Sequence, residues 1–247
     1  SDIAYIVLNV GRVAALLVAV RYGQSPWLAV GLVLLSKWRA LAVKPRFWFA
    51  NLVANMVDII VGVSFVILMY QASGEWLPQI CLALGYVVWL LFVKPRSNKK
   101  MVTLQAGTSV FLGVTALATI SYSWDSVFFI LPLWLIGYTA ARHVLGNYEE
   151  PMTQIYSLIS GLAFVELGWM AYHWLFAYSI PGMGDIKVPQ LAIILTLLSF
   201  CAERAYVSYH KHGTVKRQDI TLPIVLALGV IAVLFVFYNR IALTSSM

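Results

Sequence analysis

Nine long apolar stretches run through this chain of 247 residues, and most of the gaps between them are short. A helix that crosses the hydrocarbon core of a bilayer needs about 20 mostly apolar residues. Hydrophobic residues make up 61% of the chain and charged residues 11%, a balance that a water-soluble fold of this size could not bury. The sequence therefore predicts an all-α, polytopic membrane bundle of about nine transmembrane helices, forming one integral membrane domain over residues 1–247.

The short gaps predict that consecutive spans are antiparallel neighbours. The first stretch holds Asn9 and Arg12, so eight spans would remain if that stretch lay along the membrane surface. It lacks a basic leading region and a small-residue cleavage site, and we interpret it as a retained span, not a signal peptide. The expected spans are residues 3–21, 27–43, 47–70, 77–93, 101–122, 127–145, 151–178, 189–209 and 222–239.

Positive charge falls in alternate gaps, which predicts an orientation. Of the 17 Lys and Arg residues, 13 lie at the gaps that follow even-numbered spans, while Arg21, Lys187 and Arg240 lie on the other side and Arg12 lies within a span. Short cytoplasmic loops carry the basic excess. We therefore predict a cytoplasmic N-terminus and an outside C-terminus, most simply in the plasma (cytoplasmic) membrane. The 13 residues are Lys37, Arg39, Lys44, Arg46, Lys94, Arg96, Lys99, Lys100, Arg142, Arg204, Lys211, Lys216 and Arg217.

The net charge of +7 comes from the same membrane-proximal turns. Because no soluble domain gathers these charges into one patch, we expect no nucleic-acid partner. The expected partners are the bilayer and its anionic lipids, with a homo-oligomer or a membrane-complex partner as open alternatives. The residues expected to contact lipid headgroups or a partner are Lys44, Arg46, Lys94, Arg96, Lys99 and Lys100.

A short repeat has two interpretations, convergence of similar hairpin turns and duplication of a two-helix hairpin unit. Val-Lys-Pro-Arg occurs at residues 43–46 and again at residues 93–96, each time between two apolar stretches. Duplication of a hairpin would give parallel repeats. Convergence is the alternative, since membrane hairpins commonly have basic turns on one side and Trp-bearing turns on the other.

Three charged residues are expected near mid-depth, where each is costly and therefore a functional candidate. They are Arg12, Asp58 and Glu166. The functional interpretation is a polar pathway between the first, third, fifth and seventh spans, with both carboxylates responding to protons or ions and Arg12 as their counter-charge. Asn55 shares a helical face with Asp58, and His173 lies two turns beyond Glu166. The candidate pathway residues are Arg12, Asn55, Asp58, Glu166 and His173.

The structural alternative is that these polar side chains hold helices together by hydrogen bonds. It is the favoured interpretation for Gln105, Thr108 and Ser109, which share a face of the fifth span. Glu203 and Arg204 are adjacent on a helix and point about 100° apart, so we expect them not to pair with each other.

Enzyme signatures are absent from the sequence: it contains no zinc-protease, nucleophile-elbow or phosphate-loop motif, and its histidines do not cluster at ligand spacing. We expect no catalytic residues, metal site or cofactor. The leading hypothesis is a transporter or channel for a small solute or ion. The alternatives are a non-transporting scaffold or assembly protein that binds a partner or anionic lipid through its basic turns, and an intramembrane lipid-modifying enzyme.

Overall fold

The computed structural model of the chain describes residues 2–23, 25–38, 42, 44–121, 123–173, 176–180, 182–183 and 185–238. Within these residues it contains nine α-helices, eight of which are long and apolar enough to cross a membrane. The helical bundle is thus confirmed. The α-helices are α1 (Asp2–Tyr22), α2 (Trp27–Leu35), α3 (Trp48–Gln71), α4 (Trp76–Val88), α5 (Lys99–Ile120), α6 (Ser126–Asn147), α7 (Thr153–Tyr172), α8 (Gln190–His212) and α9 (Arg217–Val233).

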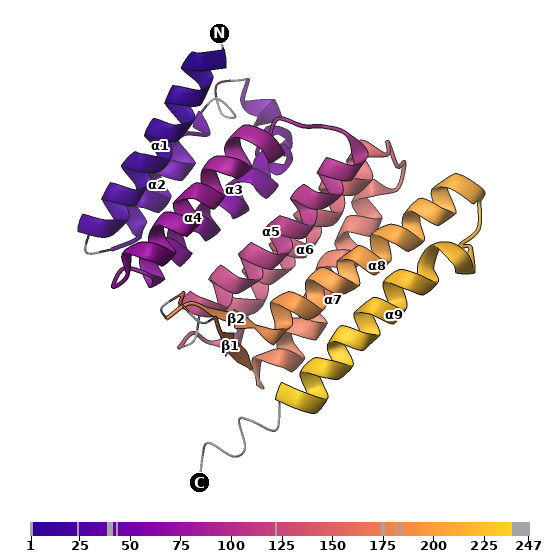
Figure 1. The fold of residues 1–247 in the computed structure, drawn as a ribbon. Helices are drawn as coiled ribbons and strands as arrows, with labels where there is room; N and C mark the ends of the chain where they lie inside the picture. The colour runs from indigo at the N-terminus through magenta and orange to yellow at the C-terminus, as the bar shows by residue number, and fades with distance from the viewer. Residues whose placement is uncertain are drawn as a thin grey trace.

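Consecutive helices run up and down (Figure 1). The N-terminus and the turns after α2, α4, α6 and α8 lie at one end of the bundle, which we call the basic end. The turns after α1, α3 and α5 and the β-hairpin lie at the other end. The alternating basic gaps of the sequence therefore gather at one end of the molecule, whereas the direction in which that end faces stays a prediction.

The second helix is too short to span the membrane, whereas the first has the length of a full span. Residues 27–43 were expected to form a full span, but α2 ends at Leu35 after nine residues. Helix α1 is 21 residues long and counts among the eight candidate spans. At about 1.5 Å per residue, α2 rises about 14 Å, roughly half of a hydrocarbon core about 30 Å thick. Ser36 and Lys37, which follow Leu35, therefore lie well inside the bundle's length.

Two larger apolar cores occupy the two halves of the bundle, and a smaller third one joins α3 to α5. One core is built from α1 to α4 around Val13, Val33 and Tyr86, and the other from α5 to α8 around Val110, Phe129 and Leu195. Helix α3 joins the halves by packing against α5 and α6, and α9 packs against α8 on the outside. A polar site within one half is thus separate from one within the other.

Several helices end with irregular turns. A 3-10 turn, η2 (Pro45–Phe47), precedes α3, and π-helical turns η3 (Trp89–Val93) and η4 (Leu234–Tyr238) extend α4 and α9. Helix α7 ends at Tyr172, so the expected span over 151–178 is too long. Instead, strands β1 (Ala177–Ser179) and β2 (Lys187–Pro189) pair antiparallel, and Ile186 beside them is buried against α3 and α5.

Large apolar side chains cover much of the outer surface. Leu28, Phe49, Leu131, Leu162 and Leu228 are all more than half exposed. Water-soluble monomers rarely expose such contiguous apolar surface. These side chains suit contact with lipid tails.

Candidate functional site

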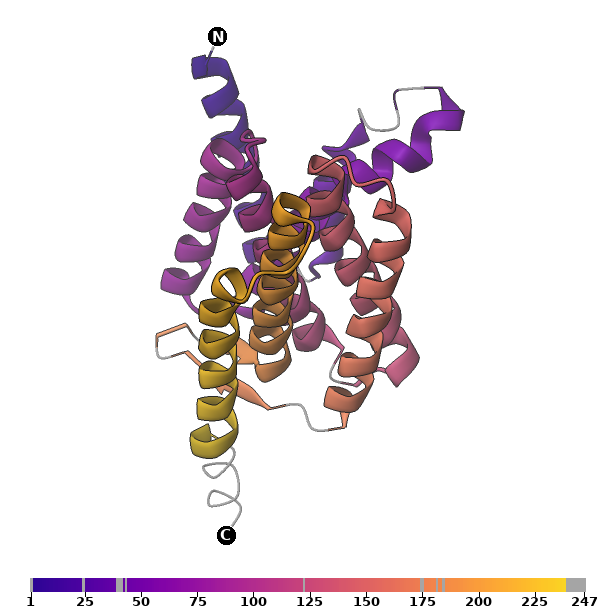
Figure 2. The same ribbon diagram turned by 90° about the vertical axis from the view of Figure 1, so that its right-hand side faces the viewer.

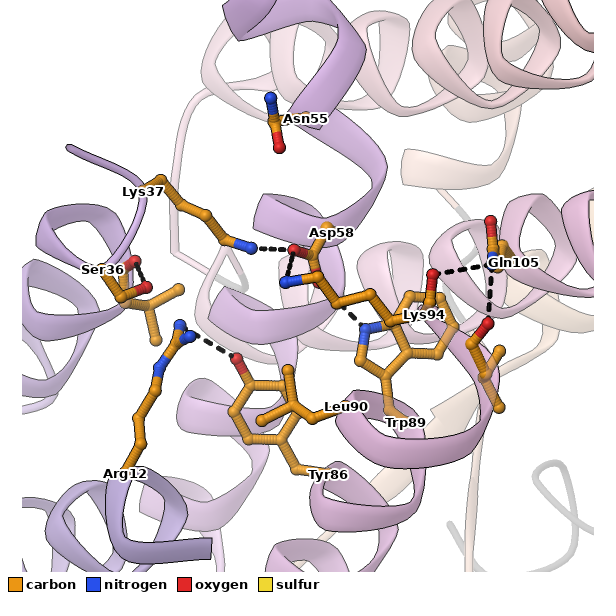
Figure 3. A network of polar contacts seen from close by, with 12 residues as sticks. Arg12, Ser36, Lys37, Asn55, Asp58, Tyr86, Trp89, Leu90, Lys94 and Gln105 are labelled. Carbon is orange, nitrogen blue, oxygen red and sulfur yellow. Dashed lines mark hydrogen bonds and ion pairs between the residues drawn. The ribbon is translucent and has the colours of Figure 1, made fainter. Parts of the chain in front are cut away.

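Asp58 of α3 is the centre of an ionic cluster. Its Oδ2 forms ion pairs with Lys37 Nζ and with Lys94 Nζ, the latter at 2.7 Å. Its Oδ1 accepts a 3.1 Å hydrogen bond from Trp89 Nε1. The side chains of Lys37 and Asp58 are only 10% and 13% exposed, so the pair is largely removed from solvent. Figure 3 shows the two lysines reaching the carboxylate from opposite sides.

Lys37 contacts Asp58 from just beyond the end of the short helix α2. The chain leaves the α-helix after Leu35 and turns through Ser36 and Lys37. Asp58 lies near the middle of α3, which places the end of a half-length helix opposite it.

Trp89 and Lys94 reach the same carboxylate because a π turn separates them. In an α-helix, residues five apart point about 140° away from each other. In η3 the backbone N–H of Lys94 donates instead to the carbonyl of Trp89 at 2.8 Å, five residues back. The wider turn brings the two side chains to one side. Single π turns of this kind are rare and occur frequently at functional sites.

Arg12 of α1 lies beside this cluster without touching Asp58. Its Nη2 is 3.5 Å from the hydroxyl of Tyr86, and no described residue forms a hydrogen bond with its buried Nε. Tyr86 is fully buried and lies one turn before Trp89 on α4. The expected counter-charge role of Arg12 thus falls to the two lysines, while Arg12 adds a third positive charge nearby.

Gln105 of α5 fixes the π turn from the other half of the bundle. Its Nε2 donates to the carbonyls of Val93 at 2.7 Å and Arg96 at 2.8 Å. Its Oε1 lies 2.8 Å from Nε2 of His143 on α6. This arrangement supports the structural interpretation of Gln105, because the amide binds backbone groups that the end of η3 leaves open.

The structure does not bring Glu166 or His173 to the cluster. Glu166 is exposed on α7, and α7 packs mainly against α6. His173 is exposed at the C-terminal end of α7, where its ring contacts Trp169 and Tyr172 edge-on. The expected single site around Arg12, Asp58 and Glu166 is therefore reduced to Arg12 and Asp58.

Asn55 is half-buried one turn from Asp58, and its Nδ2 donates a 2.8 Å hydrogen bond to the carbonyl of Asn51. Figure 3 places it on the basic-end side of Asp58, outside the ion pairs. It shares the face of α3 that the sequence predicted, but it is bonded within its own helix.

Among the basic turn residues, Lys94 departs from its expected role. Lys94 points inward to Asp58, so it is not a free headgroup contact. Its counterpart in the repeat, Lys44, is exposed, which means that the two Val-Lys-Pro-Arg copies differ in structure; Val43 lies outside the described residues. The other expected contact residues are exposed at the basic end: Arg46, Arg96, Lys99 and Lys100.

Sequence reasoning missed Lys37, Tyr86 and Trp89 as site residues. Lys37 was counted with the loop after the second span, and no simple pattern marks a π turn. The expectation that Glu203 and Arg204 stay apart is also wrong, since Arg204 Nε lies 3.2 Å from Glu203 Oε2. Neither atom has hydrogen-bond geometry with a described partner, so the two groups are close without a directed bond.

The fold and the eight apolar helices define a class, that of multi-pass, integral membrane helical bundles. No protein-family model matches the chain, and the searches of curated proteins and of solved structures found no match either. The ionic cluster around Asp58 is therefore the basis for a functional proposal.

Proposed function

We propose that this chain is a transporter or channel for a small anionic solute, with its binding site at the cluster of Lys37, Asp58 and Lys94. The observation that carries the proposal is the half-length helix α2, which ends beside a carboxylate near the middle of α3. Many secondary transporters bind substrate near the bilayer midplane, at the ends of discontinuous helices. A π turn at the same point adds a second irregular backbone segment to the site.

The charges of the cluster favour an anion. Lys37, Lys94 and Arg12 bring three positive charges to a region where Asp58 supplies one negative charge. Placing one charged side chain at the centre of a membrane helix costs about 2.5–3.5 kcal/mol on insertion scales. Helix packing alone does not require this excess of like charge, whereas a bound anion would balance it.

Competition between the Asp58 carboxylate and the anion for the two ammonium groups provides a mechanism. While Asp58 is ionised, it holds both ammonium groups; when it takes up a proton, the ammonium groups become free to bind a small anion. Proton binding and anion binding would then favour each other, and this coupling is reciprocal by thermodynamic necessity. The chain would carry an anion together with a proton.

Flux measurements on reconstituted protein test the proposal. Proteoliposomes would be loaded in turn with chloride, nitrate, phosphate and acetate, and efflux recorded with and without a pH gradient. Lys37→Met should lower flux by about tenfold or more, because a charge-assisted contact to the anion contributes about 1.5–3 kcal/mol. Asp58→Asn, whose amide cannot take up and release the proton, should remove the dependence of flux on the pH gradient. Glu166→Gln is the matched control, since it neutralises an exposed carboxylate on α7, and it should behave as wild type.

Two results would overturn the proposal. One is flux no higher than that of protein-free liposomes for all four anions. The other is a flux whose pH dependence Asp58→Asn leaves as unchanged as Glu166→Gln does. Either result would favour the scaffold interpretation, in which the cluster only joins α2, α3 and α4.

A further inference from the structure

A large groove lies in the other half of the bundle, away from the ionic cluster. Its volume is about 1040 Å³, and its lining comes from α5, α6, α7 and α8. Helix α7 packs mainly on α6 and α8 mainly on α5 and α9, so α5 and α6 form the back wall and α7 and α8 the sides. Figure 2 shows α7 and α8 standing on either side. Small side chains on the back wall, such as Gly107, Ala140 and Ala141, leave the space open.

The groove is about as long as the acyl region of one bilayer leaflet is thick. Along α5 its lining runs from Lys100 to Leu112, a rise of about 18 Å at 1.5 Å per residue. Half of a bilayer's hydrocarbon core is about 15 Å thick. Most of the lining is apolar, with Leu104, Val110, Phe111, Val144 and Phe200 among it. A lipid chain entering from the leaflet at the basic end would fit this length.

The charged groups of the groove lie toward the basic end. Lys100, Thr103, Glu203 and Arg204 line it there. Thr103 Oγ1 donates 3.1 Å to Glu203 Oε1, which places the Glu203 carboxylate level with the first turns of α5. The Glu203 side chain is only 8% exposed, and its Oε2 lies 3.2 Å from Arg204 Nε but accepts no hydrogen bond from any described residue. This oxygen is therefore able to accept a hydrogen bond from a ligand.

We propose that this groove binds one anionic phospholipid with a hydroxylated headgroup, of the phosphatidylglycerol type. The ligand's phosphate would contact Arg204 and Lys100, and a headgroup hydroxyl would donate to Oε2 of Glu203. Two cations and one carboxylate leave the mouth with one net positive charge, which a headgroup carrying one negative charge balances. The proposal is independent of anion transport at Asp58, because the two sites lie in different halves of the bundle.

Occlusion of the groove provides the first test. A Cβ added at Gly107 meets nothing within 4 Å, so Gly107→Leu would place a branched side chain in the groove from its back wall. Gly229→Leu on α9 is the matched control, because a Cβ there also meets nothing within 4 Å and Gly229 is not among the groove's lining residues. Delipidated protein would be titrated with dioleoylphosphatidylglycerol and examined by native mass spectrometry. Wild type and the control should bind one lipid, and Gly107→Leu should bind none.

Headgroup recognition provides the second test. Phosphatidylcholine, phosphatidic acid and free glycerol 3-phosphate would be compared with phosphatidylglycerol on the same protein. Wild type should prefer phosphatidylglycerol to phosphatidylcholine and phosphatidic acid, and should not bind the chain-free glycerol 3-phosphate. Arg204→Met should weaken the binding of phosphatidylglycerol by about tenfold. Glu203→Met should remove the preference over phosphatidic acid, which has no headgroup hydroxyl.

The proposal fails if phosphatidylcholine binds as tightly as phosphatidylglycerol, or if Gly107→Leu still binds the lipid. It also fails if a second copy of the chain fills the groove. A wild-type dimer that becomes a monomer in the Gly107→Leu variant would show this. Loss of proton-coupled anion flux in Asp58→Asn, with lipid binding intact, would leave this inference standing.

Discussion

The indole of Trp89 and the carboxylate of Asp58 join α4 to α3 through a 3.1 Å hydrogen bond to Oδ1. That bond orients the carboxylate so that Oδ2 faces Lys37 and Lys94. Because Lys37 follows the short α2, three helices converge on one carboxylate. The cluster therefore serves the fold whether or not it also binds a solute, and changes in stability must be measured beside changes in flux.

Asp58→Asn should destabilise the bundle. The change leaves two ammonium groups facing each other without a carboxylate, and removing one partner of a buried pair costs about 3 kcal/mol or more. The measurement is unfolding in mixed micelles by titration with sodium dodecyl sulfate. Adding Lys37→Met to Asp58→Asn should recover part of the loss. Lys37→Met alone completes the cycle: if the effects of the two single changes simply add in the double variant, the two side chains are not energetically coupled.

Gln105→Leu should loosen the π turn without removing any residue of the ionic cluster. The change takes away the donor to the carbonyls of Val93 and Arg96, and leaving buried acceptors unpaired costs about 1–3 kcal/mol. Hydrogen–deuterium exchange should speed up at the amides of η3. Thr108→Val, on the same helix, is the control. Unchanged exchange at η3 in Gln105→Leu would mean that the amide does not fix this turn.

Gly62→Ala should destabilise the bundle, because Gly62 lies where α2, α3 and α4 meet. A Cβ there would lie 2.8 Å from the Tyr86 hydroxyl and 2.9 Å from Val33, and overpacking of this kind costs about 1–3 kcal/mol. Gly31→Ala on α2 is the control, since its Cβ would meet nothing within 4 Å. Thermal unfolding in detergent should show a lower Tm for the first variant. Equal Tm values would contradict the tight packing of Tyr86 on α3.

The orientation can be measured by labelling single cysteines. In a background with Cys81→Ala and Cys201→Ala, Ser97→Cys would mark the basic end and Ser73→Cys the opposite end. If the basic excess is cytoplasmic, a membrane-impermeant maleimide added to intact cells should label Ser73→Cys and spare Ser97→Cys. The reverse pattern would refute the predicted orientation.

Sequence reasoning predicted the helical bundle and the importance of Asp58, but not the partners of Asp58. Apolar length and basic gaps are local signals, so the spans and the common end of the basic turns could be predicted. The end of α2 at Leu35 could not, because the stretch over 27–43 stays apolar enough to suggest a full helix. Glu166 was expected at mid-depth, and sequence position alone could not tell that it is exposed on α7. Depth along a helix is readable from sequence, whereas the face that meets a neighbour depends on tertiary packing.

The central claim is that small anions reach the cluster around Asp58, and modification of Lys37→Cys tests it most directly. In the same background without Cys81 and Cys201, Lys37→Cys would be exposed to a negatively charged methanethiosulfonate, with exposed Lys44→Cys as the reference. Our account predicts that both cysteines react and that the transported anion in excess slows the reaction of Lys37→Cys alone. Reaction of Lys44→Cys with none at Lys37→Cys would contradict it and make the cluster a closed structural contact.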